Sequence, residues 1–165
     1  MRDTMIYKPE RKPKKALLYI VILFIIAATC IGVLANGVNF KWLFQLMIFI
    51  CLVLFIQSII RYFIYEYKYI ISNNAFSVVQ ISGKREKVLC NLDLSTAVGV
   101  YDAERFGHEK KNIGHIKSLY NYTQNFMPDN RFYYVFEFNG AKCCVSFETS
   151  REFADALKEK TTKEP

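Results

Sequence analysis

The chain has 165 residues, of which 52% are hydrophobic, 16% aromatic and 22% charged, and its formal net charge is +7. This composition excludes an intrinsically disordered chain, because such chains are poor in aromatic residues. A disulfide framework is not expected, since Cys30 and Cys51 lie inside apolar runs. Between Ala16 and Ile60 the only charged residue is Lys41. The sequence therefore predicts a membrane anchor followed by a domain of roughly 100 residues, enough for one hydrophobic core.

The anchor consists of two apolar segments, residues 16–34 and 42–60, which contain no charged residue. With a rise of about 1.5 Å per residue, a helix over either segment just crosses a hydrocarbon core of roughly 30 Å. The connection at residues 35–41 is short and contains the turn dipeptide Asn36-Gly37, so the helices should run antiparallel as neighbours. We expect a transmembrane helical hairpin.

Basic residues flank this hairpin unequally. Those before the first helix are Arg2, Lys8, Arg11, Lys12, Lys14 and Lys15. Arg61 and Lys68 follow the second helix, and the loop between the helices has Lys41 alone. Because Lys and Arg concentrate on the cytoplasmic side of a membrane, we expect a multi-pass protein of the inner (cytoplasmic) membrane with both termini in the cytoplasm.

The predicted organisation is a basic cytoplasmic tail (1–15), the hairpin (16–60), a cytoplasmic domain (61–160) and a short tail (161–165). An alternative treats the N-terminus as a cleaved signal, because Ala27-Ala28-Thr29-Cys30 resembles a lipoprotein cleavage box. Thr29 is a poor fit where a small residue is expected, and a second apolar span follows at once. We therefore expect an uncleaved hairpin.

After residue 62 the hydrophobic period changes to two, which is typical of strands. Seven strands are predicted, at residues 65–71, 75–81, 85–90, 96–101, 118–122, 131–138 and 141–147. Residues 102–117 are read as a polar loop. A terminal amphipathic helix should begin after Thr149, with Glu152 completing a capping box.

The hairpin of the last two strands can be aligned residue by residue. Asn139-Gly140 is a strong signal for a two-residue hairpin loop and pairs Phe138 with Ala141. The same register opposes Phe136 to Cys143, Tyr134 to Val145 and Phe132 to Phe147 on one apolar face. On the other face it opposes Glu137 to Lys142 and Arg131 to Glu148. A slip of one residue would destroy both patterns.

Seven antiparallel strands closed by a C-terminal helix resemble the pleckstrin-homology-like (PH-like) domains that follow transmembrane hairpins in small bacterial proteins. The residues that carry the likeness are Tyr67-Lys68-Tyr69-Ile70-Ile71 before Asn73-Asn74, Gly83-Lys84-Arg85, Asn91-Leu92-Asp93-Leu94-Ser95, and Val145-Ser146-Phe147 before Phe153 and Leu157. The resemblance implies an α+β fold: a transmembrane helical hairpin, then a PH-like seven-stranded antiparallel barrel or sandwich capped by a C-terminal helix. Phosphoinositide-binding relatives gather Lys and Arg around the first strand connection. Here that connection, Ser72-Asn73-Asn74, contains no cation, which argues against an inositol phosphate site.

Candidate catalytic and metal-binding residues are few. His108 and His115 are seven residues apart, whereas two zinc ligands on one helix face need a spacing of four. Cys143 and Cys144 are adjacent on a strand, so we expect Cys143 in the core and Cys144 outside. We predict no catalytic, cofactor-binding or metal-binding residue, and expect a protein that is not an enzyme.

The basic residues suggest contact with anionic lipid, since a cation near such a surface contributes about 1 kcal/mol. The candidates are Lys12, Lys14, Lys15, Lys84, Arg85, Lys110 and Lys111. An ordinary mixed-charge surface explains the same residues, because acidic residues such as Glu104 and Glu109 lie among them. We expect no nucleic-acid partner, because the predicted domain has little net charge, and identify no small-molecule substrate.

The sequence thus favours a non-enzymatic, membrane-anchored PH-like protein that serves as a protein-interaction or oligomerisation module, with the lipid bilayer and a protein partner or second copy as its contacts. One alternative is a module that senses anionic lipid headgroups. Another is an accessory subunit of a membrane enzyme or transporter, although Gln45, Gln57 and Ser58 are not ionisable and transport pathways usually need buried charge.

The predicted topology can be tested by cysteine labelling in intact cells. In a variant without native cysteines, Asn39→Cys should react with a membrane-impermeant maleimide, because the short loop faces outward, and Ser72→Cys should not. The reverse pattern would contradict the prediction that both termini are cytoplasmic.

Overall fold

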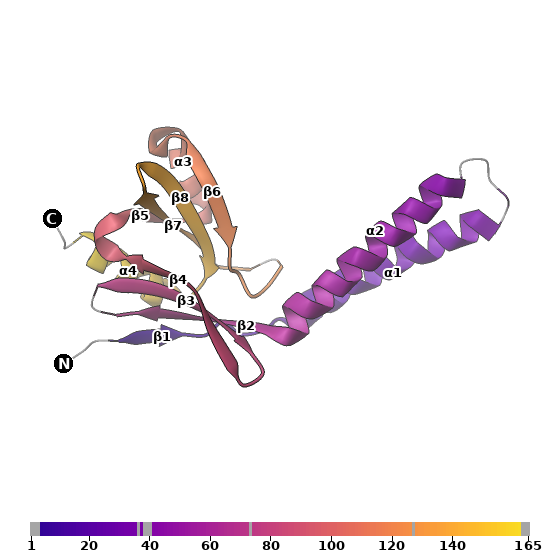
Figure 1. The fold of residues 1–165 in the computed structure, drawn as a ribbon, viewed down its shortest axis with the longest axis horizontal. Coiled ribbons are helices and arrows are strands. Elements are labelled where there is room, and N and C mark those ends of the chain that lie inside the picture. The colour runs from indigo at the N-terminus through magenta and orange to yellow at the C-terminus, as the bar shows by residue number, and fades with distance from the viewer. Residues whose placement is uncertain (1–3, 36, 38–40, 73, 127, 163–165) are drawn as a thin grey trace. The chain divides into compact units, whose positions relative to one another are not determined.

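A computed structural model describes residues 4–35, 37, 41–72, 74–126 and 128–162 of the chain, except for the side chains of residues 13–16. The chain divides into two compact units (Figure 1). The hairpin unit comprises Arg11–Ile64. The other unit, here called the sheet domain, comprises Met1–Glu10 together with Tyr65–Pro165.

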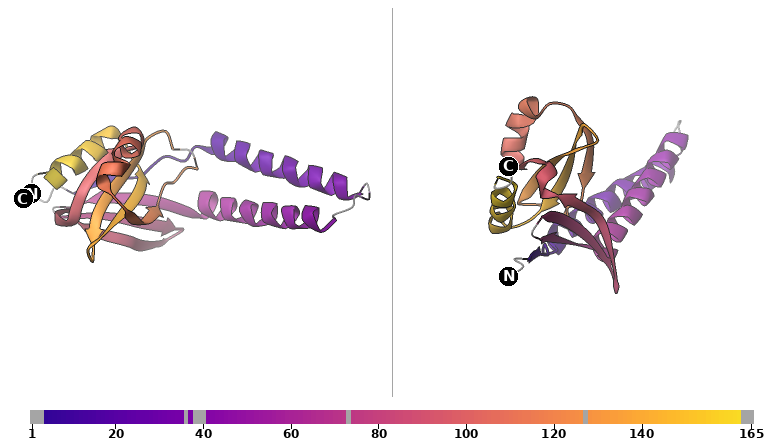
Figure 2. Two further views of the ribbon diagram at one scale, coloured as in Figure 1. Left: turned by 90° about the horizontal axis from the view of Figure 1, so that it is seen from above. Right: turned by 60° about the vertical axis from the view of Figure 1, so that its left-hand side comes forward.

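The hairpin unit contains two helices that run side by side, α1 (Pro13–Ala35) and α2 (Lys41–Ile59), the second continuing as a π-helical turn at Ile60–Ile64 (Figure 1, Figure 2). Both are long and apolar enough to cross a membrane. Helix α1 begins before the predicted residue 16, because a proline at the first helical position loses no hydrogen bond. Most of the predicted turn at residues 35–41 lies outside the described residues.

Two polar side chains within the helices, Thr29 and Ser58, form hydrogen bonds inside their own helix. Thr29 Oγ1 donates to the carbonyl of Ile26 at 2.8 Å, and Ser58 Oγ donates to the carbonyl of Leu54 at 2.6 Å. Such local bonds suit a helix surrounded by lipid, where an unsatisfied polar group is costly.

The sheet domain contains two four-stranded sheets. Sheet A has the order β1 (Met5–Tyr7), β2 (Tyr65–Ile71), β3 (Ala75–Ser82) and β4 (Arg85–Asp93). A 3₁₀ turn at Leu94–Thr96 leads to sheet B, with the order β5 (Ala97–Asp102), β7 (Arg131–Phe138), β8 (Ala141–Glu148) and β6 (Ile116–Asn121). Helix α3 (Ala103–Ile113) follows β5, and α4 (Arg151–Thr162) ends the described chain. The predicted α+β class and the order of hairpin, sheets and C-terminal helix are confirmed.

The main core lies between the two sheets and α4. It is rich in aromatic side chains, and Tyr69, Phe76, Tyr134 and Phe147 are fully buried in it. The Phe76 ring lies 5.0 Å from that of Phe147 and 5.3 Å from that of Tyr134, centroid to centroid, so the two sheets meet through aromatic contacts.

The register predicted for the β7–β8 hairpin is confirmed throughout, from Phe138↔Ala141 to Arg131↔Glu148. Asn139 and Gly140 both have positive φ, 50° and 71°, as a type I′ turn requires. Glu137 and Lys142 are opposite each other, as predicted. Lys142 Nζ also donates to the carbonyl of Ile113 at 2.7 Å, which links β8 to the end of α3.

The prediction that all strands are antiparallel is wrong for one pair in sheet B. Strands β6 and β8 are parallel. The reason is the segment read as a polar loop, which is mostly helix α3. Strands β5 and β6 run in the same direction, and such strands need a crossover connection of about a dozen residues, which α3 supplies on the outer face of the sheet.

The terminal helix also begins differently from the prediction. Its first residue is Arg151, and Ser150 Oγ, not Thr149, accepts a hydrogen bond from the Phe153 amide at 3.3 Å. Thr149 is buried, and its Oγ1 has no hydrogen-bond partner among the described residues.

The segment predicted as a basic tail contributes a strand, so the described chain has eight strands in place of seven. Strand β1 pairs antiparallel with β2, from Met5↔Ile71 to Tyr7↔Tyr69. The Tyr7 ring stacks on that of Tyr69 and lies 5.8 Å from that of Phe153. The hairpin unit is therefore an insertion between two paired strands of one sheet.

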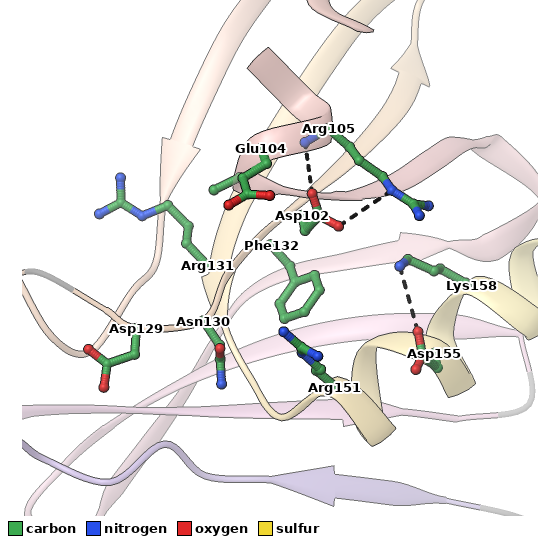
Figure 3. A pocket seen from close by; sticks show the side chains of 11 residues that line it. Asp102, Glu104, Arg105, Asp129, Asn130, Arg131, Phe132, Arg151, Asp155 and Lys158 are labelled. Atoms are coloured by element: carbon green, nitrogen blue, oxygen red, sulfur yellow. Dashed lines mark hydrogen bonds and ion pairs between the residues drawn. The ribbon is translucent and has the colours of Figure 1, made fainter. Parts of the chain in front are cut away.

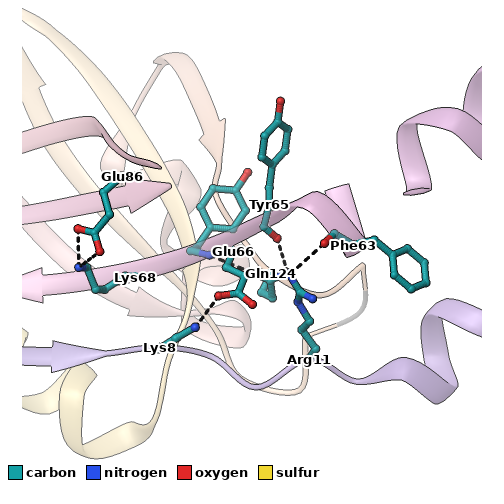
Figure 4. Close-up of polar contacts among 9 residues, drawn as sticks. Lys8, Arg11, Phe63, Tyr65, Glu66, Lys68, Glu86 and Gln124 are labelled. Atoms are coloured by element: carbon teal, nitrogen blue, oxygen red, sulfur yellow. Dashed lines mark hydrogen bonds and ion pairs between the residues drawn. The ribbon is translucent and has the colours of Figure 1, made fainter. Parts of the chain in front are cut away.

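A loop after β6 holds both chain segments that lead to and from the insertion. Gln124, which is buried, donates to the carbonyl of Tyr65 at 3.1 Å and accepts from the amide of Tyr67 at 3.0 Å (Figure 4). Asn125 Nδ2 donates to the carbonyl of Glu10 at 2.9 Å. Below this loop, Lys8 forms an ion pair with Glu66. These contacts hold in place the two segments of the sheet domain that flank the hairpin in the chain.

The face assignment predicts unequal effects of two substitutions in one strand. Phe136 is 7% exposed and Phe138 is 62% exposed. Phe136→Ala should lower the free energy of unfolding by about 3 to 5 kcal/mol, and Phe138→Ala by about 0.5 kcal/mol or less. Pulse proteolysis of the full chain in detergent across a urea series measures both, and equal losses would contradict the assignment.

Strand β1 offers a second matched pair. Tyr7→Ala removes the ring that packs on Tyr69 and Phe153, so it should destabilise the sheet domain by about 1 to 3 kcal/mol. Ile6→Ala changes a side chain that is 60% exposed and should have little effect. The same urea series compares them, and a neutral Tyr7→Ala would show that β1 does not stabilise the domain.

Candidate functional site

The cations predicted to contact lipid are spread over separate elements. Lys84 and Arg85 lie at the β3–β4 turn of sheet A, and Lys110 and Lys111 lie in the last turn of α3, which covers sheet B. Figure 1 shows these two places on opposite sides of the sheet domain. Lys12 precedes α1, and Lys14 and Lys15 belong to its first turn, where side chains lie outside the description. The seven residues therefore do not form one site within the sheet domain.

Residues of the connection between β2 and β3 form hydrogen bonds within the sheet domain. The Ser72 amide donates to the carbonyl of Ala75 at 2.9 Å, and Asn74 Nδ2 donates to the Asp93 carboxylate at 3.5 Å. Hydrogen bonds from Ser95 hold the pKa of Asp93 below its usual range, so this carboxylate is charged. A negative charge beside the loop opposes phosphate binding, as the absence of cations also does. Asn73 lies outside the described residues.

Helix α3 is the feature that sequence reasoning missed. Its N-cap is Asp102, whose Oδ1 accepts from the Arg105 amide at 2.8 Å, and it ends at Gly114 with φ of 84°. Phe106 stacks on Tyr133 with ring centroids 4.0 Å apart, and Ile113 is buried beside it. The sequence does contain cap signals for this helix, Asp102 before its first residue and Gly114 after its last. Its packed face, however, is marked only by Phe106 and Ile113, so the helical period is weak.

Because α3 covers sheet B, Cys144 is fully buried beneath it, contrary to the expectation that it lies outside. Cys143 is in the main core, as predicted. Burial raises the pKa of Cys144 to about 12, so its thiol is protonated and unreactive at neutral pH. His108 and His115 are exposed, and the described residues contain no cluster of His, Cys, Asp or Glu that could hold a metal ion.

A groove of about 610 Å³ lies between α3 and strand β6, here called the α3–β6 groove. Phe106, Ile116 and Leu119 supply apolar contacts, and Lys110, Lys111 and His115 supply polar ones. None of its lining residues is acidic. Leu119 is 59% exposed, which leaves a large apolar side chain uncovered in the groove.

A second depression, of about 620 Å³, lies between the start of α3 and helix α4 (Figure 3). It is lined by equal numbers of basic and acidic side chains: Arg105, Arg131, Arg151 and Lys158 with Asp102, Glu104, Asp129 and Asp155. Arg105 pairs with Asp102 at 3.7 Å and Lys158 with Asp155 at 3.6 Å. Figure 3 shows Arg131 turned away from Arg105 and Lys158. The balanced charges leave no net attraction for an anion, so the α3–β6 groove is the stronger candidate.

Comparison with known proteins agrees with the fold. The family model described as "Bacterial PH-like domain (DUF6106)" matches residues 6–164, from within β1 to beyond α4. No curated protein and no solved structure matches the chain. Because this match covers nearly the whole chain, the chain belongs to the bacterial PH-like domain family DUF6106.

Proposed function

We propose that this protein is a non-enzymatic, membrane-anchored binding module. In this proposal the apolar hairpin crosses the inner membrane twice, and the PH-like sheet domain meets a protein partner on the cytoplasmic side. The observation that carries the proposal is the α3–β6 groove, where the exposed Leu119 belongs to β6, a strand whose outer edge is unpaired among the described residues. Contiguous apolar surface rimmed by polar groups marks interaction sites, and Leu119 and Ile116 form such a surface beside Lys110 and Lys111.

The position of the hairpin in the chain supports a role for the sheet domain at the membrane surface. The hairpin is inserted between paired strands β1 and β2, and the loop at Gln124 and Asn125 orders the chain on both sides of the insertion. Within the hairpin unit, Arg11 Nη2 donates to the carbonyl of Phe63 at 3.4 Å (Figure 4). A domain held to its anchor by two chain connections suits the recruitment of a partner to a membrane.

A second candidate function is the sensing of anionic headgroups. Its support is the position of Lys84 and Arg85, because the pairing Tyr65↔Ser82 places the β3–β4 turn at the end of sheet A where β2 begins. Tyr65 directly follows the apolar hairpin in the chain. Such an attraction would be non-specific and would weaken as salt shortens the Debye length to about 8 Å.

The two functions can be separated by photo-crosslinking in living cells. A benzophenone amino acid replaces Leu119 in one variant and Val88, on the edge strand β4, in another; these side chains are 59% and 60% exposed. Because only Leu119 lies in the groove, irradiation should join it to a discrete protein, and Val88 should give no matching adduct. Absence of a protein adduct at Leu119, or equal adducts at both positions, would contradict the proposal. Lipid adducts alone would favour headgroup sensing.

A further inference from the structure

The outer edge of β6 is open in the described part of the chain. Sheet B ends at β6, which pairs on its other side with β8 from Ser118↔Cys143 to Asn121↔Ser146. An irregularity between Ile116 and Ser118 interrupts the start of the strand. The open edge therefore runs from Ser118 to Asn121, long enough for a few backbone hydrogen bonds to an added strand.

The side chains along this edge fit a strand bound at the groove. Leu119 is opposite Cys144, whose side chain lies beneath α3, so Leu119 is on the α3 face of the sheet. Ile116 is also packed on that face, against Phe106 and its neighbours. A strand added to β6 would place every second side chain over this apolar floor.

The charged side chains that line the groove are all basic. Lys110 and Lys111 are exposed at the end of α3, and Lys117 is exposed on β6. A neighbouring depression, lined by His115, Lys117 and Lys142 among others, also contains no acidic residue. An occupant with carboxylates would therefore find complementary charge at the end of the groove where α3 ends and β6 begins.

Two other occupants fit less well. A second copy that paired through its own β6 would present the same groove, whose lining contains no acidic residue, so it would supply no charge complementary to Lys110 and Lys111. A lipid could meet the lysines and the apolar floor, but a headgroup cannot supply the alternating donors and acceptors that pair with a strand edge.

We infer that the α3–β6 groove binds an extended, acidic segment of a partner protein, which adds as a strand to the open edge of β6. This inference rests on the proposed function and specifies the chemistry of the partner. Apolar side chains of the segment cover Leu119 and the half-buried Ile116, and its carboxylates meet Lys110 and Lys111.

Peptide selection on the full chain in lipid nanodiscs tests the inference. Displayed libraries of short linear peptides should become enriched in sequences that alternate acidic residues with β-branched or aromatic ones. The variant Lys110→Glu with Lys111→Glu should bind a selected peptide about tenfold more weakly or worse, because two attractive charges become repulsive. Methylating alternate backbone nitrogens of the peptide should abolish binding, since these groups pair with β6.

The matched control is Lys87→Glu with Arg151→Glu, which makes the same change in net charge on exposed residues away from the groove. It should change the affinity by less than about twofold. Equal loss in both double variants, unchanged binding after N-methylation, or no acidic enrichment would overturn the inference. If peptides fail in these ways while Leu119 still crosslinks to a protein in cells, only the partner chemistry is wrong. Displacement of the peptide by phosphatidylglycerol nanodiscs but not by phosphatidylcholine ones would assign the groove to lipid.

Discussion

The pairing of β1 with β2 is the constraint on which the arrangement of this protein depends. These strands are adjacent in sheet A but are separated in the chain by the whole apolar hairpin. The sheet domain is therefore complete only when the segment before the hairpin returns to it, through Tyr7 on Tyr69 and through Asn125 on the carbonyl of Glu10. A fragment that begins after the hairpin lacks β1, so binding studies on the domain need both segments.

The crossover through α3 determines the candidate site. It brings β6 beside β8 in parallel, buries Cys144 and, in the part of the chain that the structure describes, leaves one side of β6 open. Lys142 fastens the end of the helix by donating to the carbonyl of Ile113. The same element thus covers part of sheet B and forms one wall of the groove, which is why apolar floor and basic rim occur together. Lys110 and Lys111 also suit the negative end of the α3 dipole, so they stabilise the helix that carries them.

Sequence reasoning identified the groove's lysines but assigned them to a different site. It grouped Lys110 and Lys111 with Lys84 and Arg85 as candidate contacts with anionic lipid. The fold separates the two pairs onto different sheets, and it places the α3 pair beside Leu119, an apolar residue that no motif marked. Charge can be counted from a sequence, whereas the neighbours of each charge depend on how the chain crosses the sheet.

The sequence by itself determined the features that depend on local order: the apolar hairpin, the alternation of Tyr67, Tyr69 and Ile71 in β2, and the β7–β8 register set by Asn139-Gly140. Period and turn chemistry act between residues close in the chain, so they are readable there. Only the tertiary structure decided that Met5–Tyr7 is a strand, that residues 103–113 are a crossover helix and that β6 is parallel to β8. Each of these depends on contacts between residues far apart in the chain, and segments too short to show a clear hydrophobic period adopt the structure that those contacts stabilise.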